Sequence, residues 1–211
     1  MWLLLRIYPP DLPAQSACAD TNGRIDSPSA CGGTAERAFS RVMRSRRPPS
    51  SETVKLFLFA VGRPRSPVAA AIEDYEARVK RYFTFDVGDV KEEAFRRAGD
   101  AARVRDEEGK RLLARIPPGM EIVALHEAGK TWSSQQLADY LAELALRGSP
   151  GAAFLIGGAY GLSDEILGRA RHQLSLSAFT LPHELARLVL AEQLYRAATI
   201  NRGEPYHKGR E

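Results

Sequence analysis

The sequence of 211 residues contains only two cysteines, Cys18 and Cys31, and both lie in its first quarter. The remaining three quarters therefore hold no disulfide, which fits a reducing compartment. No apolar run approaches the roughly 18 residues that a membrane-spanning helix needs. We therefore expect a soluble, cytoplasmic protein that has no membrane partner.

The sequence also lacks the motifs of several large enzyme classes. Residues 129–131 read Gly-Lys-Thr but have no upstream glycine at the spacing of a phosphate-binding loop, and residues 157–161 do not fit the G-x-G-x-x-G pattern. Ser175 and Ser177 are not in a nucleophile elbow. Nor do the histidines have the spacing of metal ligands; they are His126, His172, His183 and His207. These absences argue against kinases, dehydrogenases, serine hydrolases and metal-dependent enzymes.

The chain also lacks a large excess of either positive or negative charge. The chain has 30 basic and 26 acidic residues, a formal charge of +4. Residues 1–53 hold seven arginines and five acidic residues, so the remainder has 23 basic and 21 acidic groups, or +2. Such a mild excess is compatible with binding to nucleic acid but does not predict it.

Residues 1–53 differ from the rest of the chain. They contain six of the 13 prolines, and no helical or strand periodicity persists in them. The sequence therefore predicts a disordered extension. An ordered pattern begins abruptly at Val54, and a GTG valine codon is also a bacterial start codon. An alternative hypothesis is therefore that translation begins at Val54 and that 1–53 is a mis-assigned start, which leaves 54–211 as the functional domain.

From Val54 onward, short apolar runs alternate with helical patterns. Such alternation predicts an α/β fold with a mainly parallel sheet and helices on both of its faces. The ligand of such a sheet binds at the carboxyl ends of its strands. We expect strands at 55–61, 85–90, 120–126, 152–156 and 174–179, and helices over 68–83, 100–116, from Ser133, from Ser163 and from Pro182.

Three of these strand ends are candidates for a pocket that holds a small polar ligand. The first follows Leu125, the second contains Gly157 and Gly158, and the third is residues 176–181. Glycine would let a ligand approach the backbone closely. A polar tail with Tyr206 and His207 is expected beside this pocket. The pattern alone leaves open whether the glycines form only a tight turn and residues 180–183 only a helix entry.

Three C-terminal motifs carry a resemblance to a known family. They are L-I-G-G-x-x-G-L-S, then L-S-x-S-x-x-T-L-P-H-x-L-x-R-x-x-L-x-E-Q-x-Y-R-A, and finally R-G-x-P-Y-H-K. Together with the opening K-L-x-L-x-A-V-G, they strongly resemble the SPOUT-class methyltransferases, and within that class the 23S ribosomal RNA pseudouridine N3-methyltransferases. The resemblance covers about residues 54–207, and residues 1–53 have no counterpart in it.

The resemblance implies a trefoil-knotted fold, a homodimer and S-adenosylmethionine as the methyl donor. It implies that the cofactor is held by Leu125, Gly157, Leu176, Ser177, Ala178, Phe179, Thr180 and Leu181. The implied substrate is a pseudouridine of 23S rRNA in the ribosome. Six apolar residues of the final helix make a face that suits a dimer, namely Leu185, Leu188, Val189, Leu194, Tyr195 and Ala198.

The tail is then expected to take part in catalysis. His207 is the candidate base for the weakly acidic N3–H, because a free imidazole titrates near pH ~6.5. Tyr206 would stack on or orient the target base, and Pro205 would restrict the tail. His183 is expected to be structural, because it begins a helix. Five cations are candidates for RNA phosphates, although each is also a typical solvated charge: Arg187, Arg196, Arg202, Lys208 and Arg210.

Two other functions remain open from the sequence. A ribose 2′-O-methyltransferase of the same class would need a group that activates a hydroxyl, for which Arg63 or Arg65 is available. A non-catalytic ribosome-assembly factor would use the same pocket as a sensor of the cofactor.

Overall fold

The computed structural model describes residues 54–65, 67–95 and 100–207, with the side chain of His207 left out. The predictions made for residues 1–53 concern a segment outside this range and stay predictions. The predictions for Lys208 and Arg210 also lie outside it.

A five-stranded parallel sheet forms the centre of the domain, with strand order β2-β1-β4-β3-β5. Two of the three inner strands, β1 and β4, are almost entirely buried, as their continuous apolar sequences predict for strands covered on both faces. The α/β class and the parallel sheet are thereby confirmed. The strands are β1 (Lys55–Val61), β2 (Thr84–Val90), β3 (Glu121–Thr131), β4 (Gly151–Ile156) and β5 (His172–Ser175).

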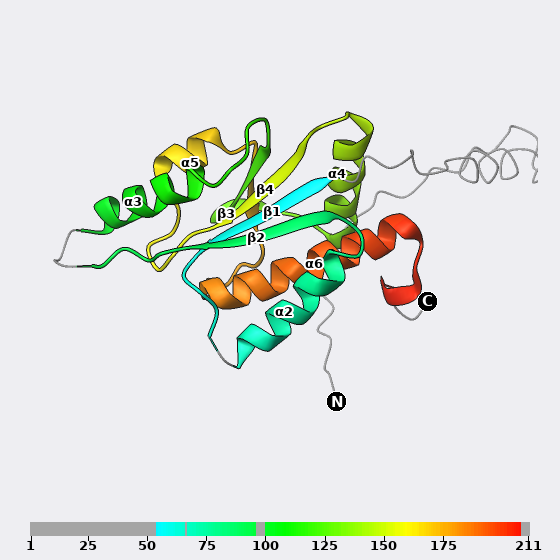
Figure 1. The fold of residues 1–211 in the computed structure, drawn as a ribbon, viewed down its shortest axis with the longest axis horizontal. Coiled ribbons are helices and arrows are strands. Elements are labelled where there is room, and N and C mark those ends of the chain that lie inside the picture. The colour runs from blue at the N-terminus through cyan, green and yellow to red at the C-terminus, as the bar shows by residue number, and fades with distance from the viewer. Residues whose placement is uncertain (1–53, 66, 96–99, 208–211) are drawn as a thin grey trace, which may run out of the picture. The chain divides into compact units, whose positions relative to one another are not determined.

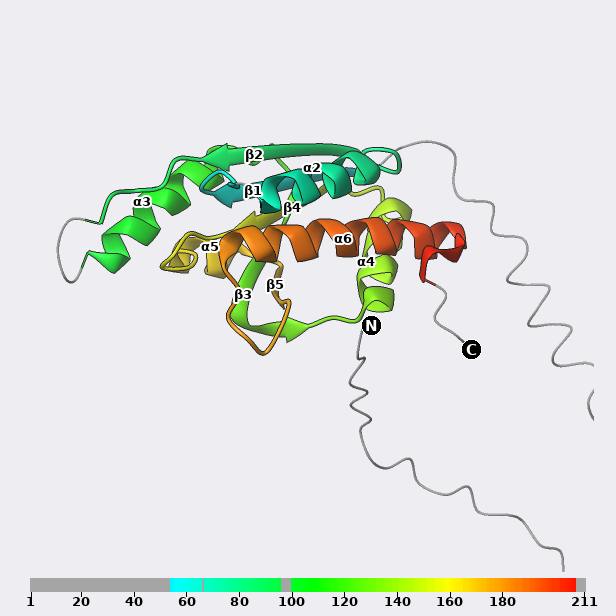
Figure 2. The same cartoon turned by 90° about the horizontal axis from the view of Figure 1, so that it is seen from below.

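Helices cover both faces of the sheet, as predicted (Figure 1). On one face α6 (His183–Arg202) packs between α2 (Val68–Val79) and α4 (Ser134–Leu146). Figure 2, seen from below, shows α2 and α6 side by side on this face. On the other face α3 (Ala101–Leu113) packs against the short α5 (Asp164–Arg169).

Each face has its own apolar core, because successive strand residues point to opposite sides of the sheet. Leu56 and Leu58 of β1 pack with Leu190 and Leu194 of α6 in the larger cluster, and all four are fully buried. Val61 packs in the second cluster, which contains residues of α3 and α5. Because the side chains of β1 alternate between the two faces of the sheet, this strand packs against the helices of both layers.

Two helices begin at the residues that the sequence predicts. Ser133 caps α4 with a capping box, in which its hydroxyl accepts from the Gln136 N–H and its own N–H donates to the Gln136 side chain. Ser163 caps α5, whose first turn carries Asp164 and Glu165 at the favourable end of the helix dipole. Both caps were predicted correctly.

Two strands, β3 and β5, differ from the prediction. β3 runs on to Thr131, because it bulges after Leu125 and pairs again with β5 at Lys130 and Thr131. β5 ends at Ser175 rather than at residue 179. The Ser177 hydroxyl accepts a hydrogen bond from the Phe179 N–H at 3.0 Å, which turns the backbone out of the sheet. Residues 176–182 are consequently a loop beside the extended end of β3 (Figure 2).

After β5 the chain passes from the edge of the sheet to α6, which lies against β1 and β4. The trefoil knot that the resemblance implies stays a prediction. None of the helices in the described ranges has the length and apolar content of a membrane span.

Candidate functional site

A cavity of about 760 Å³ lies at the bulge of β3, after Leu125, and at the carboxyl ends of β4 and β5. This is the edge of a parallel sheet at which ligands bind, and the volume is typical of a small-molecule site. The first residues of α6 complete the lining, with Pro182, His183 and Ala186.

Seven of the eight residues predicted for the cofactor line this cavity. They come from three separate strand ends: Leu125, Gly157, and the loop residues Leu176, Ser177, Phe179, Thr180 and Leu181. Ala178 is exposed and is not among the lining residues. The structure therefore brings together the three strand ends that the sequence identified, and places Ala178 on the outer side of their loop.

The paired glycines serve the packing of the chain itself. A Cβ on Gly157 would lie 2.5 Å from the carbonyl carbon of Gly161, and one on Gly158 would lie 2.8 Å from Oε2 of Glu108. The loop is closed by a bridge between Gly158 and Gly161, with a 3.0 Å hydrogen bond from the Gly161 N–H to the Gly158 carbonyl. We expected these glycines to let a ligand approach the backbone closely. The structure adds a second reason, because they form a tight turn in which no side chain would fit.

His126 is a lining residue that sequence reasoning did not single out. Its Nδ1 is one of two buried side-chain atoms without a hydrogen-bond partner in the described part of the chain, the other being Oε2 of Glu108. Buried polar atoms are normally paired, so the unpaired Nδ1 is unusual, but it is itself buried and not exposed to the cavity. The position of His126 at the end of a buried strand was the available signal.

Three other lining residues were also missed: Arg105, Tyr160 and Asp164. Arg105 belongs to α3, a helix that the sequence presents as a charged and solvated one. Tyr160 lies in the glycine loop and Asp164 in the first turn of α5. The cavity therefore offers a cation and a carboxylate in addition to its apolar walls.

The predicted catalytic tail does not lie at this cavity within one subunit. The last turn after α6 is a 3-10 helix, Pro205–His207, and Tyr206 is not among the cavity residues. The Tyr206 hydroxyl is 3.1 Å from Oε1 of Glu192. Glu192 is nine residues along the helix from His183, which corresponds to about 14 Å of helix rise. The tail was expected beside the pocket, with the subunit that supplies it left open, and one subunit does not place Tyr206 there.

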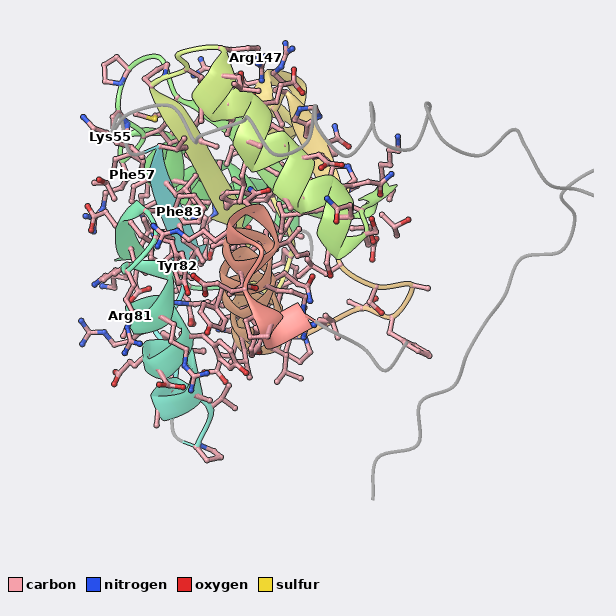
Figure 3. The ribbon with its side chains drawn as sticks, turned by 90° about the vertical axis from the view of Figure 1, so that its right-hand side faces the viewer. Lys55, Phe57, Arg81, Tyr82, Phe83 and Arg147 are labelled. Carbon is pink, nitrogen blue, oxygen red and sulfur yellow. The ribbon has the colours of Figure 1, made fainter. Side chains whose placement is uncertain are left out.

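The tail is instead held against α2 and α6. Tyr206 packs on Tyr195 with 4.7 Å between ring centroids, and the Arg196 guanidinium lies 5.1 Å from the Tyr206 ring. The Tyr82 hydroxyl donates a hydrogen bond to Glu204. Figure 3, viewed from the end at which α6 finishes, labels Tyr82 just beyond the end of α2. The chain therefore fixes Tyr206 in place.

Tyr206 is held as a neutral phenol. Burial, together with its hydrogen bond to Tyr75 and the charge of Glu192, raises the pKa of Tyr206 well above its usual range. A neutral phenol donates a hydrogen bond, so Tyr206 can orient a polar group but does not act as a base near neutral pH. Only the backbone of His207 is described, at the end of the same turn.

Arg187, a candidate for RNA phosphates, is buried, with a side chain that is only 7% exposed. Its Nε donates to Glu76 at 2.8 Å, and its Nη1 donates to Asp89. Burial alone would lower the pKa of Arg187, but the two carboxylates outweigh this and raise it. Its predicted contact with RNA is therefore wrong, because the guanidinium joins α6 to α2 and β2.

The other two described candidates for RNA phosphates also have intramolecular contacts. Arg196 pairs with Glu192, and Arg202 lies 4.6 Å from the ring of Tyr82. Arg63 is highly exposed and lies 3.8 Å from Asp89, whereas the backbone N–H of Arg65 donates to Glu184. Neither Arg63 nor Arg65 lines the cavity, which weakens the case for either as an activator of a ribose hydroxyl.

Among the residues of the described ranges, no three His, Cys, Asp or Glu side chains gather in a way that could hold a metal ion. The site therefore consists of an open cavity lined by polar and apolar residues of three strands, and of an aromatic tail that lies farther along α6.

Comparison with known proteins agrees with this arrangement. The family model described as "Predicted SPOUT methyltransferase" matches residues 54–207. The chain is 48% identical over 156 residues to the "Ribosomal RNA large subunit methyltransferase H" of Gemmatimonas aurantiaca, which covers 74% of this chain and 100% of that protein. A protein of the same name from Anaeromyxobacter sp. strain Fw109-5 is also 48% identical, with the same coverage. That of Clostridioides difficile is 41% identical over 140 residues, 65% of this chain and 88% of the relative. The chain belongs to the SPOUT methyltransferase family.

Proposed function

We propose that this methyltransferase uses S-adenosylmethionine to methylate N3 of a pseudouridine in 23S rRNA of the large ribosomal subunit. The observation that carries the proposal is the 48% identity over the whole length of a relative named as a large-subunit rRNA methyltransferase. The matched family region, residues 54–207, includes both the cavity and the tail.

The cavity fits a cofactor of this kind. Leu125, Leu176 and Leu181 supply apolar walls for an adenine, and the backbone of the two loops supplies donors and acceptors for its edge. Arg105, Glu127 and Asp164 add charged side chains to the lining for the polar parts of the ligand. When bound there, S-adenosylmethionine supplies an electrophilic methyl group.

The residues of the chain then have to align the nucleophile and remove its proton. We propose that the imidazole of His207 accepts the proton of N3, because an ordinary histidine has a pKa of about 6.5. The Tyr206 ring stacks on the base or orients it, while its hydroxyl donates to Glu192. Pro205 restricts the backbone before both residues.

We propose a homodimer, because one subunit does not place these groups at its own cavity. The Tyr206 hydroxyl is held at Glu192, whereas the cavity meets α6 at His183 and Ala186. Leu185 and Val189 are exposed on the same side of α6, four residues apart, and Phe179 is 83% exposed. Leu194 and Ala198, two other residues of the predicted dimer face, are buried within the subunit. A second copy would cover the apolar residues that remain and bring its tail to the cavity.

We further propose that the substrate is an assembled ribosomal particle in the cytoplasm. A net charge of +2 for the residues after 53 gives little attraction for a free RNA loop. Recognition by shape and by many weak contacts suits a folded particle better. Activity on naked 23S rRNA equal to that on ribosomes would contradict this part.

The proposal is tested with ribosomes from a strain that lacks the gene. The purified protein and labelled S-adenosylmethionine should place one methyl group on N3 of a pseudouridine, identified by mass spectrometry of nucleosides. A methyl group on a ribose 2′-oxygen would show the rival activity. Cofactor binding in calorimetry without any transfer would show an assembly factor.

The role of His207 is tested separately. His207→Ala should keep the cofactor affinity of the wild type and lose most of the methyl transfer, because it removes only the proton acceptor. Unchanged turnover on ribosomes would show that another group takes the proton.

A further inference from the structure

Two exposed aromatic rings are stacked on each other at the mouth of the cavity. The rings of Phe95 and Tyr160 lie with centroids 5.2 Å apart and an interplanar angle of 23°. Phe95 is 49% exposed and Tyr160 is 38% exposed. Tyr160 is a lining residue of the cavity, so the pair continues the site outward.

The segment that carries Phe95 is fastened to α3. The Glu93 N–H donates to Oε1 of Glu108 at 3.0 Å, and Arg103 donates to the Ala94 carbonyl at 3.0 Å. The Arg111 side chain donates to the Lys91 carbonyl at 2.8 Å and also pairs with Glu93. These contacts hold the backbone up to the residue before Phe95, although the segment contains no helix or strand.

The loop that carries Tyr160 rests on the same carboxyl group. Oε2 of Glu108 lies 2.8 Å from the place of a Cβ on Gly158, two residues before Tyr160. Glu108 is 4% exposed. A single buried side chain thus lies against both segments that carry the aromatic pair.

Stacked aromatic rings that remain exposed have free faces. Proteins that bind RNA hold unstacked bases on such faces, because every base has an apolar π-surface and the contact tolerates any sequence. A methyltransferase that acts on a base must reach one taken out of its stack. Arg105, which lines the same cavity, supplies a cation for an adjacent phosphate.

We propose that Phe95 and Tyr160 form a stacking platform for an unpaired base of the RNA substrate, next to the nucleotide that is methylated. The inference rests on the proposed function, since it requires an RNA substrate at this cavity. It adds a substrate-binding residue pair at the mouth of the cofactor cavity and apart from the Tyr206 tail.

The test compares four variants of the full chain: Phe95→Ala, Tyr160→Ala, and the conservative Phe95→Tyr and Tyr160→Phe. Their affinity for large ribosomal subunits from a strain lacking the gene is measured beside their affinity for S-adenosylmethionine. Each alanine variant should bind the subunits about tenfold more weakly, with cofactor affinity unchanged, and the conservative variants should resemble the wild type. The dependence of binding on salt should keep its slope, because no phosphate contact is removed.

Leu146→Ala is the matched control, because Leu146 is 67% exposed at the end of α4 and does not line the cavity. Wild-type affinity for the ribosomal subunits in both alanine variants would overturn the proposal. So would an equal loss of cofactor affinity, which would assign the rings to the cofactor, or dissociation of a dimer in sedimentation, which would assign them to a subunit interface. Failure of the wild type itself to methylate ribosomes would instead refute the proposed function.

Discussion

His183 is the first residue of α6 and Tyr206 lies in the 3-10 turn that follows its end, and only His183 lines the cavity. The Tyr206 hydroxyl is fixed at Glu192 by a 3.1 Å hydrogen bond, well along α6 from the His183 end. A methyl group is transferred over roughly 3 Å, so the proposed role of the tail in the reaction requires the proposed dimer, in which the tail of one copy reaches the cavity of the other.

The tight glycine turn allows a sharp test of the cavity. Gly157→Ala places a methyl group 2.5 Å from the backbone of Gly161, so the loop has to shift. We expect the affinity for S-adenosylmethionine in calorimetry to fall by about tenfold or more, a loss of roughly 1.4 kcal/mol. Gly168→Ala is the control, because its added Cβ meets nothing within 4 Å. Normal cofactor affinity in Gly157→Ala would show that the turn does not shape the site.

The buried arginine predicts a loss of stability rather than of RNA binding. Arg187→Leu leaves Glu76 as an unpaired buried carboxylate and should lower the free energy of unfolding by roughly 3 kcal/mol. Urea denaturation measures this loss. Arg169→Leu removes an exposed pair with Glu165 and should cost less than about 0.5 kcal/mol. Similar values for the two variants would contradict the structural role of Arg187.

The buried Glu108 predicts an unusual dependence of stability on pH. Burial raises its pKa in the folded state, so its contribution is full below the pKa of the unfolded chain and is lost as the pH rises through the folded value. Glu108→Gln should therefore match the wild type near pH 4 and become the more stable protein toward neutral pH, in thermal unfolding followed at several pH values. In contrast, salt-bridged Glu107 has a lowered pKa, so Glu107→Gln should lose stability relative to the wild type as the pH rises. A Glu108→Gln protein that is less stable at every pH would show that the carboxylate itself is needed.

The sequence predicted the sheet, its helical layers and the three strand ends of the cavity, because these depend on local apolar periodicity and on turn residues. It did not predict the loop at residues 176–182, since the Ser177 hydrogen bond that ends β5 competes with an equally plausible strand pattern. Arg187 appeared as a surface charge, because helical spacing does not reveal which partners approach from other elements. The position of the tail could not be predicted either, because it depends on the packing of the Tyr206 ring on Tyr195.

We also propose that residues 1–53 are dispensable. The described apolar core begins at Val54, and the aligned region covers the full length of the relatives from Gemmatimonas and Anaeromyxobacter. A chain that starts with Val54→Met should melt within about 2 °C of the full chain and retain its methyl transfer. Loss of folding would contradict this. An intact mass near 23.3 kDa for the protein from its native cells would contradict a start at Val54.

The account depends most on a cavity and a tail contributed by different subunits, and mixing of two inactive variants tests this directly. His207→Ala lacks the proposed base and Gly157→Arg blocks the cavity, so each alone should be inactive. Subunits of both kinds, unfolded together and refolded as mixed dimers, should regain about a quarter of the wild-type methyl transfer to N3 of the pseudouridine, since random pairing makes half of the dimers mixed, each with one intact site. Activity that stays at the level of the separate variants would contradict the shared site.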